Sequence, residues 1–114
     1  MSSNFIEDFS FGKIVIDGER YTDDIILIDK EIRSGWWRNR AHTVSKNDLA
    51  PVIDFEPELL IIGTGSSGRM DVPTSLYGEL KFKIESYPTN KACKRYNELI
   101  KKEMKLAGAF HLTC

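Results

Sequence analysis

A run of four apolar residues that leads directly into glycines most constrains how this chain can fold. The run covers residues 59–62, and the glycines follow it in the pattern Gly63-x-Gly65-x-x-Gly68. A short, continuous apolar run bounded by turn residues is typical of a strand buried on both faces, as in the middle of a parallel sheet. The sequence therefore predicts a central buried strand with a glycine-rich loop at its exit.

The chain before this strand has the pattern of an antiparallel ribbon. Residues 11–17 alternate as a strand does, and Asp17-Gly18 is a strong signal for a hairpin turn. The return strand is expected over residues 20–29, and a third short strand near 33–38. These features predict an N-terminal antiparallel β ribbon.

The rest of the chain alternates between helix and strand patterns. The expected elements are a short helix capped by Ser45 with Asp48, a helix from Pro73, a strand over 82–87, a helix over 90–104 capped by Thr89, and a strand over 106–113. The 114 residues suffice for one core, so we expect a single α/β domain spanning residues 1–114.

Composition excludes several classes of protein. Sixteen basic and seventeen acidic residues leave a net charge of −1, so no general attraction to nucleic acid is expected. No run of about 18 apolar residues exists to cross a membrane. Residues 1–10 lack the basic and apolar regions of a signal peptide. We therefore expect a cytoplasmic protein with reduced cysteines.

The glycine loop is the first candidate site. A loop after a buried strand can direct backbone N–H groups at an anion, and Ser66, Ser67 and Arg69 would add hydroxyls and a positive charge. The candidate ligand-binding residues are Gly63, Gly65, Ser66, Ser67, Arg69, Thr89 and His42. A weak site for a small anion is the corresponding prediction; the alternative is that the glycines only make a tight strand exit.

The glycine pattern also matches the dinucleotide-binding fingerprint, with Glu85 placed where such a fold has its ribose-binding acid. Pro73 places the next helix several residues after Gly68, whereas the fingerprint needs the third glycine at the helix start. We therefore expect no NAD(P) and no other cofactor.

The four cysteine and histidine residues are His42, Cys93, His111 and Cys114. Their spacing does not match a compact zinc site, so no metal is expected. Helical periodicity places Cys93 in the core as an unreactive thiol. Cys114 could pair with His42 or His111 as a thiol and imidazole, and His42 could serve as a general base.

The segment Trp36-Trp37-Arg38-Asn39-Arg40 combines aromatic and basic side chains, a combination that can mark binding of single-stranded nucleic acid. One short cluster in a nearly neutral chain is weak support for that function. We expect instead that one tryptophan packs in the core while the other covers a sheet edge or a pocket.

Residues along nearly the whole chain resemble one known family. They are Phe11, Gly12, Gly18, Tyr21, Asp24, Trp37, His42, Glu56, Pro57, Glu58, residues 60–65, Thr89, Ala92, Tyr96, Asn97 and residues 109–114. The pattern is similar to a small domain found in archaeal and bacterial proteins of unknown function, in the adipogenesis-associated domain protein and in a mitochondrial respiratory complex I assembly factor. The chain departs from it at Glu103, where relatives often have glycine, and at Lys105, where they often have arginine.

The resemblance implies a three-layer α/β fold whose central sheet is mixed, with one strand antiparallel to the others. It implies no established enzyme activity, and it suggests roles in assembly or regulation through partners. Two classes of function are therefore expected. The first is a non-catalytic binding or assembly module acting through a protein partner or a homo-oligomer. The second is a small anionic-ligand-binding protein or enzyme that uses the loop at residues 63–69.

Overall fold

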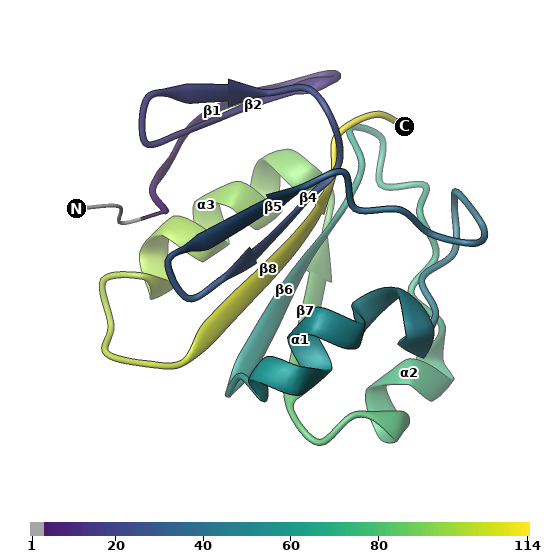
Figure 1. Cartoon of the computed structure of the whole chain (residues 1–114). Helices are drawn as coiled ribbons and strands as arrows, with labels where there is room; N and C mark the ends of the chain where they lie inside the picture. Colours follow the sequence, from purple (N-terminus) through teal and green to yellow (C-terminus); the bar gives the residue numbers. More distant parts are fainter. Residues whose placement is uncertain (1–3) are drawn as a thin grey trace.

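The computed structural model describes residues 4–114, which form two β-sheets and four helical segments (Figure 1). The elements are β1 (Ile6–Ser10), β2 (Lys13–Ile16), β3 (Glu19–Tyr21), β4 (Ile25–Ile28), β5 (Glu31–Ser34), a 3₁₀ helix η1 (Lys46–Leu49), α1 (Ala50–Phe55), β6 (Leu59–Thr64), α2 (Thr74–Glu79), β7 (Lys83–Tyr87), α3 (Thr89–Leu99) and β8 (Leu106–His111).

The five-stranded sheet is mixed and has the strand order β5-β4-β8-β6-β7. Strand β6 runs parallel to both β7 and β8, whereas β4 is antiparallel to β8 and to β5. Strand β4 is therefore the one strand that runs against the other four. The predicted mixed sheet is confirmed, and so is the burial of β6 along its whole length; β6 lies inside the sheet between β8 and the edge strand β7, while β8 is the middle strand.

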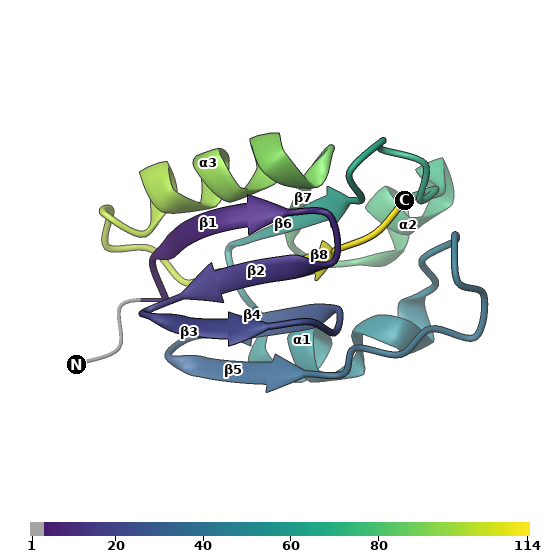
Figure 2. The same ribbon diagram turned by 90° about the horizontal axis from the view of Figure 1, so that it is seen from above.

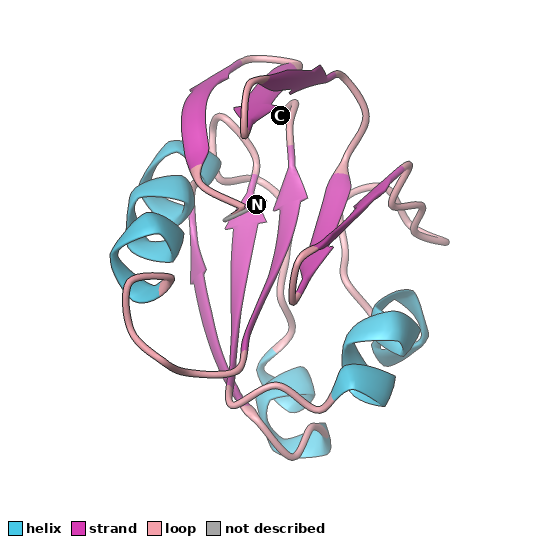
Figure 3. Cartoon of the chain, turned by 60° about the vertical axis from the view of Figure 1, so that its left-hand side comes forward, coloured by secondary structure: helices cyan, strands magenta, loops and turns pink. Residues whose placement is uncertain are grey.

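The two faces of this sheet bury two separate cores. Ile25, Leu27 and Ile61 lie in the core shared with α3 and the N-terminal strands. Their neighbours along the same strands, Ile26 and Leu60, belong to the core on the opposite face, because successive side chains of a strand point to opposite faces. Helices α1 and α2 cover that second face, so the molecule has three layers (Figure 3).

An N-terminal antiparallel ribbon is present as predicted, and it lies beside α3 (Figure 2). It has three strands, β1, β2 and β3; the strand predicted over 11–17 corresponds to β2, and β1 was not predicted. The predicted Asp17-Gly18 turn is confirmed: both residues have positive φ, as a tight two-residue hairpin turn requires. The Asn97 side chain of α3 joins the layers, since it accepts a hydrogen bond from the Ile6 N–H and donates one to the Ile6 carbonyl.

The predicted strand over 20–29 was wrong, because the structure divides it into β3 and β4, which belong to different sheets. The break lies just before β4, where the Asp24 carbonyl accepts hydrogen bonds from the N–H groups of Gly35 and Trp36. The third strand also lies earlier than predicted. Asp29, at φ 55°, makes the turn into β5, so β5 ends before the tryptophans.

The long helix was predicted to reach residue 104 but ends at Leu99. After it, Lys102 N–H bonds to the Leu99 carbonyl in a tight turn that allows β8 to begin at Leu106. Met104, predicted as part of the helix face, still packs against the core from this turn. No helix within residues 4–114 is long and apolar enough to cross a membrane.

Candidate functional site

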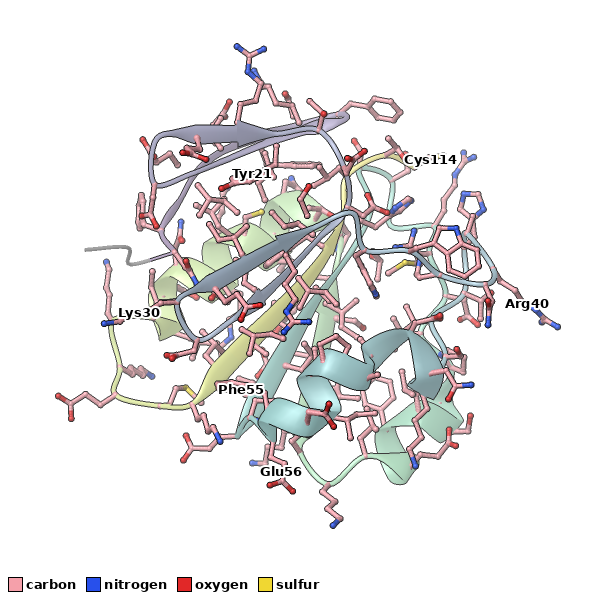
Figure 4. The ribbon with its side chains drawn as sticks, in the orientation of Figure 1. Tyr21, Lys30, Arg40, Phe55, Glu56 and Cys114 are labelled. Atoms are coloured by element: carbon pink, nitrogen blue, oxygen red, sulfur yellow. The ribbon has the colours of Figure 1, made fainter. Side chains whose placement is uncertain are left out.

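The carboxyl ends of the parallel strands form one edge of the sheet. Thr64, Tyr87 and His111 end β6, β7 and β8, which all run in the same direction. Because β4 runs the opposite way, the residue before its start, Asp24, also lies at this edge. Ligand sites in open α/β sheets lie outside the carboxyl ends of the strands, so a site is expected at this edge. Figure 4 shows Cys114 at this end of the molecule and Glu56, which precedes β6, at the other.

The first two glycines of the loop are required by close packing. A side-chain carbon on Gly63 would lie 2.8 Å from Thr89 Oγ1, too close for a real contact. The buried Thr89 hydroxyl ties three segments together, since it accepts a hydrogen bond from the Gly65 N–H and donates one to the His111 carbonyl. Thr89 thus fixes the strand exit against the start of α3.

The glycine loop holds the segment that follows β8. Gly65 has a φ of 104°, and a side-chain carbon there would lie 2.7 Å from the Cys114 carbonyl oxygen. The Ser66 N–H donates to the Thr113 carbonyl at 2.6 Å. The N–H groups of Gly65, Ser66 and Gly68 therefore already have acceptors within the chain. The side chains of Ser66, Ser67 and Arg69 are exposed.

A buried ionic cluster lies beside this segment. The Asp24 carboxylate accepts hydrogen bonds from His111 Nδ1 at 2.7 Å, from Arg38 Nη2 at 2.8 Å and from the Leu112 N–H at 2.8 Å. Arg38 also donates to the Ala41 carbonyl, and its guanidinium stacks on the Trp36 ring at 4.5 Å. The cluster joins the start of β4, the loop after β5 and the end of β8.

Hydrogen bonds outweigh burial in setting the charge of Asp24. Burial raises the pKa of the Asp24 carboxyl. The hydrogen bonds from His111, Leu112 and Arg38 lower it by more than burial raises it, so the pKa lies below its ordinary value. An ionised carboxylate only accepts, so His111 is assigned its proton on Nδ1. In the neutral ring, Nε2 then carries a lone pair. Both His111 Nε2 and Arg38 Nη1 are buried and have no hydrogen-bond partner among residues 4–114.

His42 and Cys114 lie next to the cluster. Cys114 Sγ is 3.8 Å from His42 Nε2, so the thiol is paired with His42 rather than with His111. The His42 ring lies edge-on to the His111 ring, with centroids 6.0 Å apart and an interplanar angle of 89°. His42 is exposed and Cys114 is partly buried, so solvent reaches this pair.

The two adjacent tryptophans have opposite environments. Trp36 is buried, and its Nε1 donates to the Asp48 carbonyl at 2.8 Å. Trp37 is exposed and borders a shallow hollow of about 320 Å³ that Asp24 also lines. A second hollow, of about 560 Å³, lies between the loop at residues 39–48 and α2, away from His111 and Cys114.

The predicted site residues thus fall into two groups at one edge of the sheet. Gly63, Gly65 and Thr89 are packing residues that position the chain, whereas Ser66, Ser67, Arg69 and His42 are exposed. The charged partners Asp24 and Arg38 were missed as site residues. The only sign in the sequence that Asp24 belongs to a site was its place among the residues of the family pattern. For Arg38 the only sign was its position beside the two tryptophans.

No group of three or more His, Cys, Asp or Glu side chains within residues 4–114 is arranged to hold a metal ion. Cys93 is buried in the core as predicted, and burial raises the pKa of its thiol to about 12.

Comparison with known proteins gives both a fold and a family. The conserved hypothetical protein PH1505 from Pyrococcus horikoshii OT3 superposes with a TM-score of 0.81 at 22% identity, covering 96% of this chain and 98% of that one. A structure named MT938 gives 0.79 at 25% identity with the same coverage. An outer membrane protein from Bartonella henselae gives 0.80 at 19% identity, covering 97% and 96% of the two chains.

These similarities support the three-layer mixed-sheet architecture. A family model described as a protein of unknown function (DUF498/DUF598) matches residues 6–111, nearly the whole chain, so the protein belongs to that family.

Proposed function

We propose that this chain is a non-catalytic module that binds another protein through the aromatic surface around Trp37. The observation that carries the proposal is the exposure of Trp37, whose side chain is 73% exposed while that of its neighbour Trp36 is 8% exposed. Tryptophan is among the residues most often found at the energetic centre of protein interfaces. Trp36 and Arg38, the residues on either side of Trp37, are both buried. They fix the backbone of Trp37 while its ring stays exposed to a partner.

Phe11 is a second exposed aromatic residue at this end of the sheet. It is 65% exposed, and the N–H of the next residue, Gly12, donates to the Leu112 carbonyl at 2.8 Å. Trp37 immediately precedes Arg38, which contacts His111. Both aromatic residues therefore come from loops anchored on residues 111–112 at the same end of the sheet. Because these loops are held by buried contacts, little conformational entropy would be lost on binding.

A partner other than a second copy of the chain suits this surface better. Stable homodimers bury about 800 Å² or more per subunit, and much of that area is apolar. Among the residues that the structure describes, the only large apolar side chains strongly exposed at this edge of the sheet are Phe11 and Trp37. Such a patch is suited to a smaller heteromeric interface. The resemblance to proteins with assembly roles points in the same direction.

The test is affinity capture from a lysate of the source cells with the wild-type chain, a Phe11→Ala/Trp37→Ala variant and a control variant. Phe5→Ala/Tyr77→Ala is a matched control, because both residues are exposed aromatics, each 41% exposed. Phe5 lies at the open end of the β1–β2 hairpin, opposite the Phe11 turn. We expect a protein that the wild type and the control retain and the Phe11/Trp37 variant loses.

The captured protein must then bind the purified wild-type chain directly, with an affinity that the Phe11/Trp37 variant lacks. Identical capture by all three baits would contradict the proposal. Native mass spectrometry across a concentration series tests the homo-oligomer, since a dimer abolished by the same variant would replace the heteromeric interpretation.

A second candidate function is weak binding of a small anion by the exposed side chains of Ser66, Ser67 and Arg69. The supporting observation is that all three are exposed at the carboxyl end of β6. Replacing them together by alanine should change the free energy of unfolding by no more than about 0.5 kcal/mol. In tens of millimolar phosphate, with chloride at matched ionic strength as control, the wild type should gain melting temperature and the variant should not. Equal gains would contradict an anion site at this loop.

A further inference from the structure

Cys114 and His42 form a thiol–imidazole pair at the carboxyl edge of the sheet, with Sγ and Nε2 3.8 Å apart. A nearby imidazole is the group that most often activates a cysteine as a nucleophile. His42 is exposed and Cys114 is only partly buried. The thiol therefore has both a base within reach and a route to solvent.

Separate segments hold the two partners in place. Thr113, next to Cys114, accepts the Ser66 N–H, and the Cys114 backbone rests directly on Gly65. On the other side, the His42 carbonyl accepts the Asp71 N–H at 2.7 Å, and Thr43 forms a β-bridge with Asp71. Residues distant in the sequence, in the segments around Gly65 and Asp71, thus hold the pair in position.

The surroundings of the pair supply a second sign of a site. His111 is 5% exposed and lies edge-on to the His42 ring, and its Nε2 has no hydrogen-bond partner among the described residues. Arg38, 8% exposed, has an unpaired Nη1 in the same cluster. A buried polar atom without a partner is costly and is usually explained by a ligand, a water molecule or a functional role. Arg38 and Asp24 are paired with each other, and His42 is the base that contacts the thiol.

We propose that Cys114 is a reactive thiol that exchanges with small-molecule disulfides, with His42 as the base. The thiol proton passes from Sγ to His42 Nε2, and the resulting thiolate attacks one sulfur of a disulfide RSSR. A new S–S bond forms between Cys114 and one RS group while the original S–S bond breaks, and its electron pair leaves on the other sulfur. That thiolate takes the proton from His42 and departs as RSH. Cys114 is oxidised and one RS group is reduced, so no further reactant is needed.

The chain contains its own unreactive reference. Cys93 is buried in the core between α3 and the sheet, and burial raises the pKa of its thiol to about 12. A disulfide in solution cannot reach Cys93 while the protein is folded. Selective modification of Cys114 therefore distinguishes a specific site from general thiol chemistry.

The experiment treats the intact folded chain with glutathione disulfide at pH 7 and follows the adduct on each cysteine by mass spectrometry and peptide mapping. The variants are His42→Gln, which removes the base, and Cys114→Ser, which removes the thiol. Arg40→Gln is the matched control, because Arg40 is exposed in the same loop and lines the hollow beside α2, which includes neither His42 nor Cys114. Melting curves establish that each variant is folded.

We expect the wild type to be modified at Cys114 and Cys114→Ser to remain unmodified. An unassisted thiol is only about 3% thiolate at pH 7, so loss of the base can slow the reaction by at most about thirtyfold. We expect His42→Gln to be about tenfold slower and Arg40→Gln to stay within about twofold of the wild type. Between pH 6 and 8 the rate of His42→Gln should rise about tenfold per pH unit, as for a free thiol, and the wild-type rate should rise less steeply.

Either of two results would overturn the proposal. One is a wild-type rate at Cys114 no faster than that of the same cysteine in the urea-unfolded chain. The other is an unchanged rate in a folded His42→Gln variant. Neither outcome depends on whether the aromatic surface binds a partner.

Discussion

The buried ionic cluster makes a sharp prediction for the replacement of Asp24 by asparagine. In the wild type, one carboxylate oxygen accepts the Leu112 N–H, and the other accepts both Arg38 and His111. Asparagine keeps one side-chain oxygen, so it can accept either the Leu112 N–H or the donors of Arg38 and His111, but not both sets. Its amide nitrogen, however, faces donors, and the Arg38 guanidinium loses its counter-charge.

The burial of the pair sets the size of the effect. The Arg38 side chain is 4% exposed and that of Asp24 is 16% exposed. Removing one partner of a buried ion pair typically costs about 3–5 kcal/mol, and the partial exposure of Asp24 points to the lower end, about 3 kcal/mol. The entropy of unfolding scales with length, and for 114 residues it amounts to about 0.24 kcal/mol per kelvin. The melting temperature should therefore fall by about 12 °C.

Urea and thermal unfolding of Asp24→Asn measure this loss, with Asp23→Asn as the matched control. Asp23 is the exposed neighbour, and its replacement should cost no more than about 0.5 kcal/mol. A further variant, Asp24→Asn with Arg38→Met, should be more stable than the sum of the single changes predicts, because it removes the uncompensated charge as well. An Asp24→Asn variant within 0.5 kcal/mol of wild type would refute the stabilising role of the cluster.

The same prediction has a defined pH dependence. The pKa of Asp24 is lower in the folded chain than its ordinary value, so its stabilisation is fully present above the ordinary carboxyl pKa of about 3.9. It is lost as the pH falls through the folded value. The stability difference between wild type and Asp24→Asn should therefore stay large near neutral pH and shrink below about pH 4.

Three further predictions concern the glycine loop, the buried thiol and cofactors. Gly65→Ala should lower the free energy of unfolding by about 2 kcal/mol or more, because its φ is 104° and the Cys114 carbonyl oxygen would lie 2.7 Å from the added carbon. Gly12→Ala is the control and should cost less, because its φ is 77° but no atom lies within 4 Å of the added carbon. Cys93 should resist thiol labelling in the native protein and react only after unfolding; rapid native-state labelling would contradict its burial. A titration of tryptophan fluorescence should show no saturable NAD(P) binding at micromolar levels, because α2 begins at Thr74, too far after the glycines to receive a pyrophosphate.

Local patterns in the sequence were sufficient to predict an α/β domain with an N-terminal antiparallel ribbon, whereas the three layers and the mixed sheet were expected only from the family resemblance. The run at residues 59–62 predicted a strand buried inside the sheet, because burial on both faces leaves no polar position in a strand. Asp17-Gly18 predicted its turn, since both positions need positive φ. The same patterns did not show that residues 20–29 are divided between β3 and β4, because strand periodicity carries no information about which sheet a residue joins.

The ionic cluster was beyond these patterns for a different reason. Asp24 and His111 are 87 residues apart in the sequence, and Arg38 is 73 residues from His111. In the sequence, Arg38 stands in a polar, aromatic segment where a solvent-facing side chain is the ordinary expectation. The antiparallel placement of β4 beside β8 brings Asp24 next to His111, and the loop after β5 carries Arg38 back to them. The contact between the glycine loop and residues 113–114 is equally non-local.

The cluster supports both the aromatic surface and the thiol, so a change in the cluster should affect both proposed activities. A change on one side of it should affect only one of them. Asp24 anchors Arg38, the residue after Trp37, and it anchors the segment that leads to Cys114 by accepting the Leu112 N–H. Trp37→Ala should weaken partner binding and leave disulfide exchange unchanged, whereas His42→Gln should do the reverse. Asp24→Asn, assayed well below its melting temperature, should weaken both, because it loosens the support that the aromatic surface and the thiol share. If Asp24→Asn altered only one of the two, the supporting role of the cluster would be confined to that side of the site.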